Sequence, residues 1–155
     1  MDKIAFADRI KEDELPYAEL TSLILKCCFD VMNELGTGFL ESVYKNALCL
    51  ALKQTQIVVE VEKPLDVYFR GQKVGVYKAD ILVQGLVIIE LKCCKRLLPE
   101  HQAQVINYLK AANIPVGLLI NFGHKNLDYN RLHHPLLYSS VESDIIDPVF
   151  SNLPF

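Results

Sequence analysis

The stretch KADILVQGLVIIELKC, residues 78–93, limits the folds open to this chain of 155 residues more than any other feature. Two apolar runs flank Gly85, a pattern typical of two strands joined by a tight turn. The second run is almost wholly apolar, which indicates a strand in the centre of a sheet. Three ionisable residues, Asp80 in the first run and Glu90 and Lys92 in the second, stand where a core would favour aliphatic side chains. The fold must therefore give these charges partners.

The segments around this hairpin predict helices and further strands. Apolar residues at helical spacing predict helices over residues 17–35, 39–54 and 99–113, the first two separated by Gly-Thr-Gly and the third beginning at Pro99. The expected strands are residues 58–69, as a strand pair or as one strand bent at Pro64, then 74–84, 86–93, 116–122 and one further strand over 127–132. This order predicts an α/β sandwich with a mixed central sheet.

Composition indicates one globular domain over residues 1–155, with 51% hydrophobic and 23% charged residues. The first residues lack the pattern of a secretory signal, and Lys26 and Asp30 interrupt the longest apolar stretch, so we expect a cytoplasmic protein without membrane association. The five cysteines form no CxxC pattern and are expected to be small buried residues in a reducing compartment: Cys27, Cys28, Cys49, Cys93 and Cys94.

The charge distribution is compatible with a nucleic-acid partner. The net charge is −3, but residues 21–129 hold twelve basic and ten acidic side chains, so the acidity lies in the two terminal segments. A bound divalent cation would make the middle of the chain more positive.

The three charges of the central hairpin are expected to lie together. If the hairpin turns symmetrically about Gly85, Asp80 stands opposite Glu90, with their Cβ atoms about 4.5–5.5 Å apart. Lys92 then points to the same face, because side chains two residues apart share a face. Two opposed carboxylates repel each other unless a cation neutralises them, and hard oxygen ligands suit Mg²⁺ or Mn²⁺. A lysine beside such a cation suits hydrolysis of a phosphodiester bond.

Another interpretation of the same residues is a solvent-facing strand edge with salt bridges, which is common for an acid and a lysine two residues apart. A register slip of one residue would also send Asp80 and Glu90 to opposite faces. The site is therefore conditional on the turn at Gly85.

The order Asp80, then Glu90-Leu91-Lys92, on adjacent strands resembles the signature of the PD-(D/E)XK nuclease superfamily. The sequence GFLESVY, with Gly38, Glu41 and Tyr44, resembles the motif of the GxxExxY family within that superfamily. The resemblance covers about residues 20–132 and leaves a C-terminal tail, residues 133–155, unassigned. It departs from the superfamily name at Ala79, which stands where the name has proline.

The resemblance implies a restriction-endonuclease-like fold with a mixed sheet flanked by helices, and a set of site residues. Asp80 and Glu90 would be the main metal ligands, joined by Glu41 and by the Leu91 backbone carbonyl. The implied catalytic residues are Glu41, Asp80, Glu90, Lys92, Gln104 and Tyr108, and the residues expected to contact substrate are Tyr44, Lys95 and Arg96. The spacing of Gln104 and Tyr108 at i and i+4 independently places them on one helical face.

Several of these residues also have a purely structural interpretation. Glu41 suits the first turn of a helix, where the helix dipole favours a carboxylate, and Tyr44 suits the apolar core. Gln104 and Tyr108 suit a surface pair, and His101 suits a polar group at a helix start. His133 and His134 are expected in a loop, and Gly-Thr-Gly at 36–38 suits a helix stop and restart better than a phosphate cradle.

The sequence therefore predicts a Mg²⁺- or Mn²⁺-dependent nuclease that acts on DNA or RNA. An alternative is an inactive domain of the same fold that binds nucleic acid or protein, and a third hypothesis is a small-molecule phosphate or nucleotide binder at Gly-Thr-Gly. The short chain leaves little room for a target-recognition domain, so activity is expected to need a homodimer or a partner protein.

Overall fold

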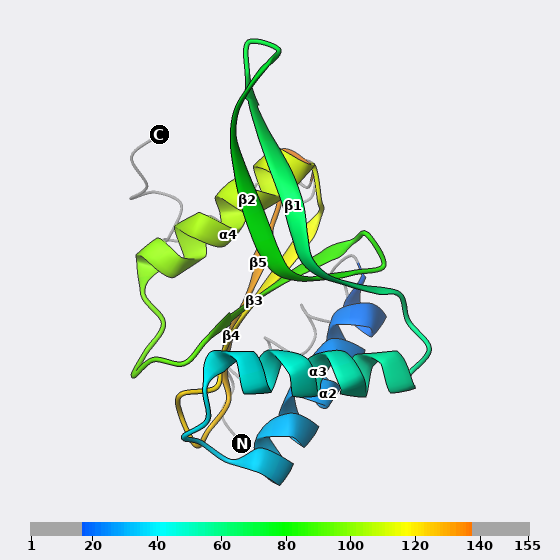
Figure 1. The fold of residues 1–155 in the computed structure, drawn as a ribbon, viewed down its shortest axis with the longest axis vertical. Coiled ribbons are helices and arrows are strands. Elements are labelled where there is room, and N and C mark those ends of the chain that lie inside the picture. Colours follow the sequence, from blue (N-terminus) through cyan, green and yellow to red (C-terminus); the bar gives the residue numbers. More distant parts are fainter. Residues whose placement is uncertain (1–16, 138–155) are drawn as a thin grey trace, which may run out of the picture.

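The computed structural model describes residues 17–137, which form three helices and one five-stranded sheet (Figure 1). The elements are, in chain order, α2 (Ala18–Leu35), α3 (Glu41–Gln54), β1 (Val59–Phe69), β2 (Gln72–Val83), β3 (Val87–Lys92), α4 (Pro99–Ala112), β4 (Val116–Asn121) and β5 (Asp128–His133). Predictions that concern residues 1–16 and 138–155 lie outside the described residues.

The sheet has the order β1-β2-β3-β4-β5, and only the pair β3–β4 is parallel. A parallel pair needs a crossover connection, and α4 supplies it between these two strands. The expected mixed sheet between helices is therefore confirmed. The segment expected as a strand or a strand pair over residues 58–69 forms the single strand Val59–Phe69, and Glu62 within it has a left-handed φ of 52°.

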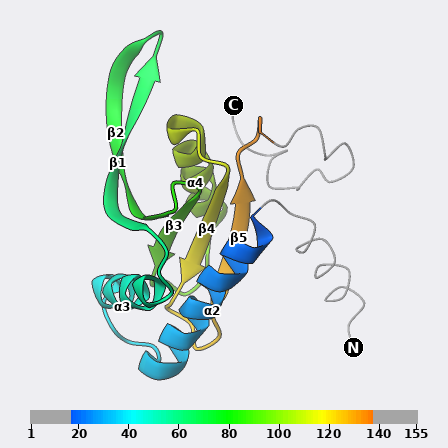
Figure 2. The ribbon, with the colours of Figure 1, turned by 90° about the vertical axis from the view of Figure 1, so that its right-hand side faces the viewer.

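Two apolar cores hold the helices on opposite faces of the sheet (Figure 2). Helices α2 and α3 pack on one face through residues that include Ile24, Leu48, Ile81, Ile89 and Leu118. Helix α4 packs on the other face through Val105, Ile106, Leu109, Leu82, Ile88 and Leu119. The central strands β3 and β4 are thus covered on both sides, as their continuous apolar sequences predict.

The predicted hairpin register is confirmed. The pairs Ile81↔Ile89, Leu82↔Ile88 and Val83↔Val87 all follow the symmetric turn about Gly85. Gln84 and Gly85 have φ values of 54° and 66°, and the Leu86 N–H donates to the Val83 carbonyl at 2.9 Å. A glycine suits this turn because it adopts positive φ without steric cost.

Two smaller predictions need correction. Cys27, Cys28 and Cys49 are buried as expected, but Cys93 is exposed, because it follows β3 in the loop toward α4. His133 is the last residue of β5 and pairs with Val116, rather than lying in a loop. Within residues 17–137, no helix has the length and apolar character needed to cross a membrane.

Candidate functional site

The site lies where β2 leaves β3. The ladder between these strands extends over three residue pairs and ends at Ile81↔Ile89. Beyond it, the Asp80 N–H donates to Glu90 Oε1 at 3.1 Å, and the Leu91 N–H donates to Asp80 Oδ2 at 2.8 Å. The two carboxylates therefore accept the backbone N–H groups that a continuing ladder would have paired. Asp80 and Glu90 lie together, as the predicted register requires.

The alternation of side chains between the two faces of β2 is interrupted at this point. Ala79 and Leu82 both pack in the core under α4, whereas Ile81 packs under α2 and α3. Residues three apart on a regular strand point to opposite faces, so the alternation shifts by one residue near Asp80. Glu62, opposite Asp80 in the register, has its left-handed φ at the same place. The distortion turns the distal part of β1 and β2 away from the sheet (Figure 1).

Glu90 is the most strongly perturbed group of the site. Its side chain is 5% exposed, and burial, followed by the charge of Asp80, raises its pKa to about 8. The hydrogen bond from the Asp80 N–H and the charge of Lys92 act in the opposite direction, because both favour the ionised form of Glu90. Glu90 thus holds a proton next to the half-buried Asp80, and a divalent cation can take the place of that proton and neutralise both carboxylates.

Lys92, the last residue of β3, connects this pair to α4. Its Nζ donates to Gln104 Oε1 at 3.3 Å. Tyr108, one turn further along α4, is buried and hydrogen-bonds to Gln104, and its ring lies 4.7 Å from that of Tyr77 in β2. Burial, followed by the charge of Glu90, raises the Tyr108 pKa to about 12. The structure therefore brings Lys92, Gln104 and Tyr108 into one connected group beside the carboxylates.

Glu41 is the exposed first residue of α3, and it lies close enough to Asp80 for the two charges to interact. Desolvation and then the charge of Asp80 raise its pKa, while Lys92 and Lys45 act in the opposite direction. Among residues 17–137, no three histidine, cysteine or acidic side chains are close enough to hold one metal ion together. Glu41 is thus an electrostatic neighbour of Asp80, and within residues 17–137 it belongs to no cluster of three such side chains.

Tyr44 requires a correction. The side chain is fully buried, and its ring stacks on Phe122 with centroids 4.8 Å apart. Its hydroxyl donates to the Gly36 carbonyl and accepts from the Phe39 N–H at 3.3 Å. A side chain enclosed in this way cannot contact a substrate. Tyr44 instead fixes the connection between α2 and α3, which agrees with the interpretation of Gly-Thr-Gly as a helix stop and restart.

Lys95 and Arg96 are exposed in the loop between β3 and α4. This loop is held by Asn121, which sequence analysis did not select. Asn121 is fully buried; its Oδ1 accepts from the Cys94 N–H at 3.0 Å and the Gly123 N–H at 2.9 Å, and its Nδ2 donates to the Cys94 carbonyl at 2.9 Å. A polar residue at the end of the apolar run VGLLIN was the available signal.

The remaining histidines considered from sequence have structural roles. His101 Nδ1 accepts from the Leu98 N–H at 3.0 Å, at the start of α4. His134 is buried, and its Nδ1 accepts from the Leu136 N–H at 3.1 Å. Both rings thus bind backbone N–H groups near their own position in the chain.

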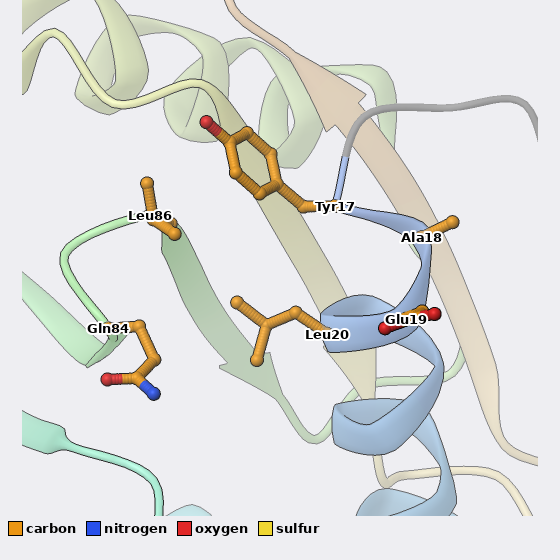
Figure 3. A pocket seen from close by; sticks show the side chains of 6 residues that line it. All are labelled: Tyr17, Ala18, Glu19, Leu20, Gln84 and Leu86. Carbon is orange, nitrogen blue, oxygen red and sulfur yellow. The ribbon is translucent and has the colours of Figure 1, made fainter.

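A separate surface hollow lies between the start of α2 and the β2–β3 turn (Figure 3). It is lined by Tyr17, Ala18, Glu19, Leu20, Gln84 and Leu86. These residues include one acid and no basic side chain, so the hollow offers neither a carboxylate pair nor a lysine for phosphodiester chemistry.

The sequence profile of the PD-(D/E)XK nuclease superfamily matches residues 18–132. The chain belongs to that superfamily. No curated protein gives a significant match.

Among solved structures, the crystal structure of SSO0001 is similar, with a TM-score of 0.47 and 22% identity over 61% of this chain. The match covers 50% of the other protein, so the chain spans about half of its length.

Proposed function

We propose that this protein is a Mg²⁺- or Mn²⁺-dependent nuclease of the GxxExxY family that hydrolyses phosphodiester bonds in DNA or RNA. The observation that carries the proposal is the buried Glu90 next to the half-buried Asp80 at the end of the β2–β3 ladder, with Lys92 beside them. Superfamily membership supports the same chemistry. The motif residue Gly38 lies in the connection before α3, and Glu41 is the first residue of α3 and senses the charge of Asp80, which supports the narrower family assignment.

The donor set fits a hard divalent cation. Asp80 and Glu90 offer carboxylate oxygens, the Leu91 backbone carbonyl is the additional oxygen that the family resemblance implies, and Glu41 adds negative charge from α3. When bound, such a cation supplies a more acidic water and offsets charge on the phosphate.

The chain's own residues prepare this chemistry. The hydrogen bond from Lys92 Nζ to Gln104 holds the ammonium group beside the carboxylates, where it can stabilise charge that develops on a phosphate oxygen. Tyr108 fixes Gln104 from the next turn of α4. Lys95 and Arg96, on the loop that Asn121 anchors, supply exposed positive charge for the nucleic-acid backbone.

Cleavage assays test the proposal directly. The purified protein is incubated with plasmid, linear duplex, single-stranded DNA and RNA in Mg²⁺ and in Mn²⁺. We expect cleavage that Lys92→Ala and Glu90→Ala reduce by about 10²-fold or more, since positioned charged groups contribute at that level. Lys53→Ala, at an exposed lysine near the end of α3, is the matched control and should cleave like the wild type. Undiminished cleavage by the Lys92 and Glu90 variants would overturn the mechanism.

Calorimetric titration with Mn²⁺ separates the nuclease from an inactive domain of the same fold. Binding that Asp80→Asn removes and Asp66→Asn preserves supports the metal site, because Asp66 lies on the neighbouring strand outside the cluster. An absence of Mn²⁺ binding by the wild type favours the inactive, nucleic-acid- or protein-binding alternative.

We further propose that residues 1–155 act as one domain, with residues 18–132 as its family-like core. Among residues 17–137, three helices around one sheet leave little surface for a separate target-recognition unit. This limited size supports a homodimer or a protein partner in the active form.

A further inference from the structure

The distal part of the β1–β2 ribbon is the largest feature that the candidate site does not use. Within residues 17–137, the parts of β1 and β2 beyond Asp80 pair only with each other, and Figures 1 and 2 show this ribbon standing out from the helices and the sheet. Its base is fixed on α4, because Leu65 and Ala79 are buried there and Tyr77 contacts Tyr108. The ribbon therefore projects in a defined direction from the carboxylate pair.

The far part of the ribbon, residues 67–78, is called the arm here. It exposes apolar and aromatic side chains to an unusual degree: Tyr68 is 61%, Phe69 60% and Val74 62% exposed. These exposed side chains lie close together along a slender projection, and a gathering of exposed apolar groups is typical of an interaction surface.

The charge of the arm indicates what it contacts. It contains Arg70, Lys73 and Lys78 and no acidic residue, although the whole chain has a net charge of −3. Arg70 lies over the Phe69 ring at 4.9 Å, and Lys73 pairs with Asp66 just outside the arm at 3.1 Å. Positive charge interleaved with exposed aromatic rings complements the phosphates and the base or sugar faces of nucleic acids.

We propose that the arm, residues 67–78, binds nucleic acid beside the candidate site. Arg70, Lys73 and Lys78 contact phosphates, and Tyr68 and Phe69 contact bases or sugars. The proposal rests on the proposed nuclease function and assigns the substrate a second point of contact. A two-stranded ribbon has the width that a duplex major groove admits, and the exposed rings also suit unpaired bases.

A second copy of this chain fits the arm less well. In a two-fold symmetric contact the same patch meets itself, so the three basic residues of each arm would face those of the other without an acidic partner within the arm. Like charges opposed across an interface oppose association.

The test measures binding separately from cleavage. Fluorescence anisotropy follows labelled single-stranded DNA, duplex DNA and RNA of one sequence in EDTA, over a series of salt concentrations. We expect Arg70→Glu to reduce the slope of log affinity against log salt by about one. The double variant Tyr68→Ser/Phe69→Ser should bind about tenfold more weakly, from lost ring contacts. The labelled nucleic acid that binds with the highest affinity shows whether the arm prefers single-stranded DNA, duplex DNA or RNA.

Matched controls change the same chemistry elsewhere on the surface. Lys53→Glu alters charge on α3, and Leu50→Ser removes an apolar side chain that is equally exposed, at 61%. Both should bind like the wild type, and thermal unfolding should be unchanged in all variants because the substituted residues are exposed.

The outcomes separate this proposal from the proposed function. If both arm variants keep the wild-type affinity and salt slope, the proposal that the arm binds nucleic acid is wrong, even if the protein cleaves nucleic acid. If the arm variants weaken binding but the wild type shows no cleavage, the arm proposal is supported and the proposed nuclease activity is contradicted. A wild-type dimer in sedimentation that the double variant converts to a monomer, with unchanged nucleic-acid binding, overturns the arm in favour of a second copy.

Discussion

Strand β2 has two halves that meet at Asp80, and their difference explains where the candidate site lies. Residues 81–83 pair with β1 on one side and β3 on the other, and Ile81 and Val83 are fully buried. Residues 72–79 pair with β1 alone, and Val74 and Val76 are exposed. One half contributes to the core, while the other projects into solvent.

The boundary between the halves leaves backbone groups without ladder partners, and polar side chains there supply the missing hydrogen bonds. A ladder that ends inside a protein leaves backbone N–H groups unpaired, and each costs free energy unless a partner is found. The carboxylates of Asp80 and Glu90 are those partners. The residues that satisfy the backbone are therefore also the proposed metal ligands.

The comparison is tested most strongly in the buried half. Ile81→Ala removes a fully buried side chain from the core under α2 and α3, and we expect a loss of about 2–5 kcal/mol in the free energy of unfolding. Urea unfolding monitored by circular dichroism measures the loss. A change as small as that of an exposed residue would contradict the assignment of this half to the core.

The next effect concerns Glu90 at the boundary. Because its pKa is raised from the usual 4.5 to about 8, the folded protein keeps a proton that the unfolded chain releases in this range. Without metal, wild-type stability should therefore fall as pH rises from 4.5 to about 8, and the stability contribution of Glu90 is fully present only below 4.5. Glu90→Gln cannot release the proton, so its stability advantage over the wild type should grow with pH.

Urea unfolding in EDTA across this pH window measures that advantage, and Glu60→Gln on β1 is the control for a carboxylate outside the cluster. Added Mn²⁺ should stabilise the wild type and not the Glu90→Gln variant at the upper end of the window. Parallel pH profiles for wild type and Glu90→Gln would show that Glu90 titrates normally.

A smaller effect is expected at the loop beyond the buried strands. Asn121→Ala removes three hydrogen bonds and leaves the Cys94 and Gly123 backbone groups unpaired, at a cost of about 1–3 kcal/mol for a buried group. If the loop presents Lys95 and Arg96 to substrate, KM should rise more than kcat falls. Exposed Asn46→Ala is the matched control. Unaltered KM together with lowered stability would give Asn121 a structural role alone.

The smallest effect is expected in the projecting half. Val76→Ala, on the same strand as Ile81, should change the free energy of unfolding by less than about 0.5 kcal/mol, as is usual for exposed positions. Ile81→Ala and Val76→Ala both truncate a β-branched aliphatic side chain on β2, so the difference between their losses reports the difference in burial. A large loss at Val76 would show that the arm packs against something in the folded protein.

Local sequence determined the elements and the hairpin. The turn at Gly85 and the apolar runs beside it are neighbours in the chain, so symmetric pairing placed Asp80 opposite Glu90 without knowledge of the rest of the fold. Helical spacing likewise predicted that Gln104 and Tyr108 share a face, and both lie on the side of α4 near Lys92.

Only the tertiary structure decided the remaining features. The approach of Glu41 to Asp80, the burial of Tyr44 on Phe122 and the anchoring of the Cys94 loop by Asn121 join residues far apart in sequence. The exposure of the arm depends on where the β2–β3 ladder stops. Sequence periodicity shows which face a residue shares with its near neighbours in the chain. These contacts depend instead on how whole helices and strands pack, and both cores together determine that packing.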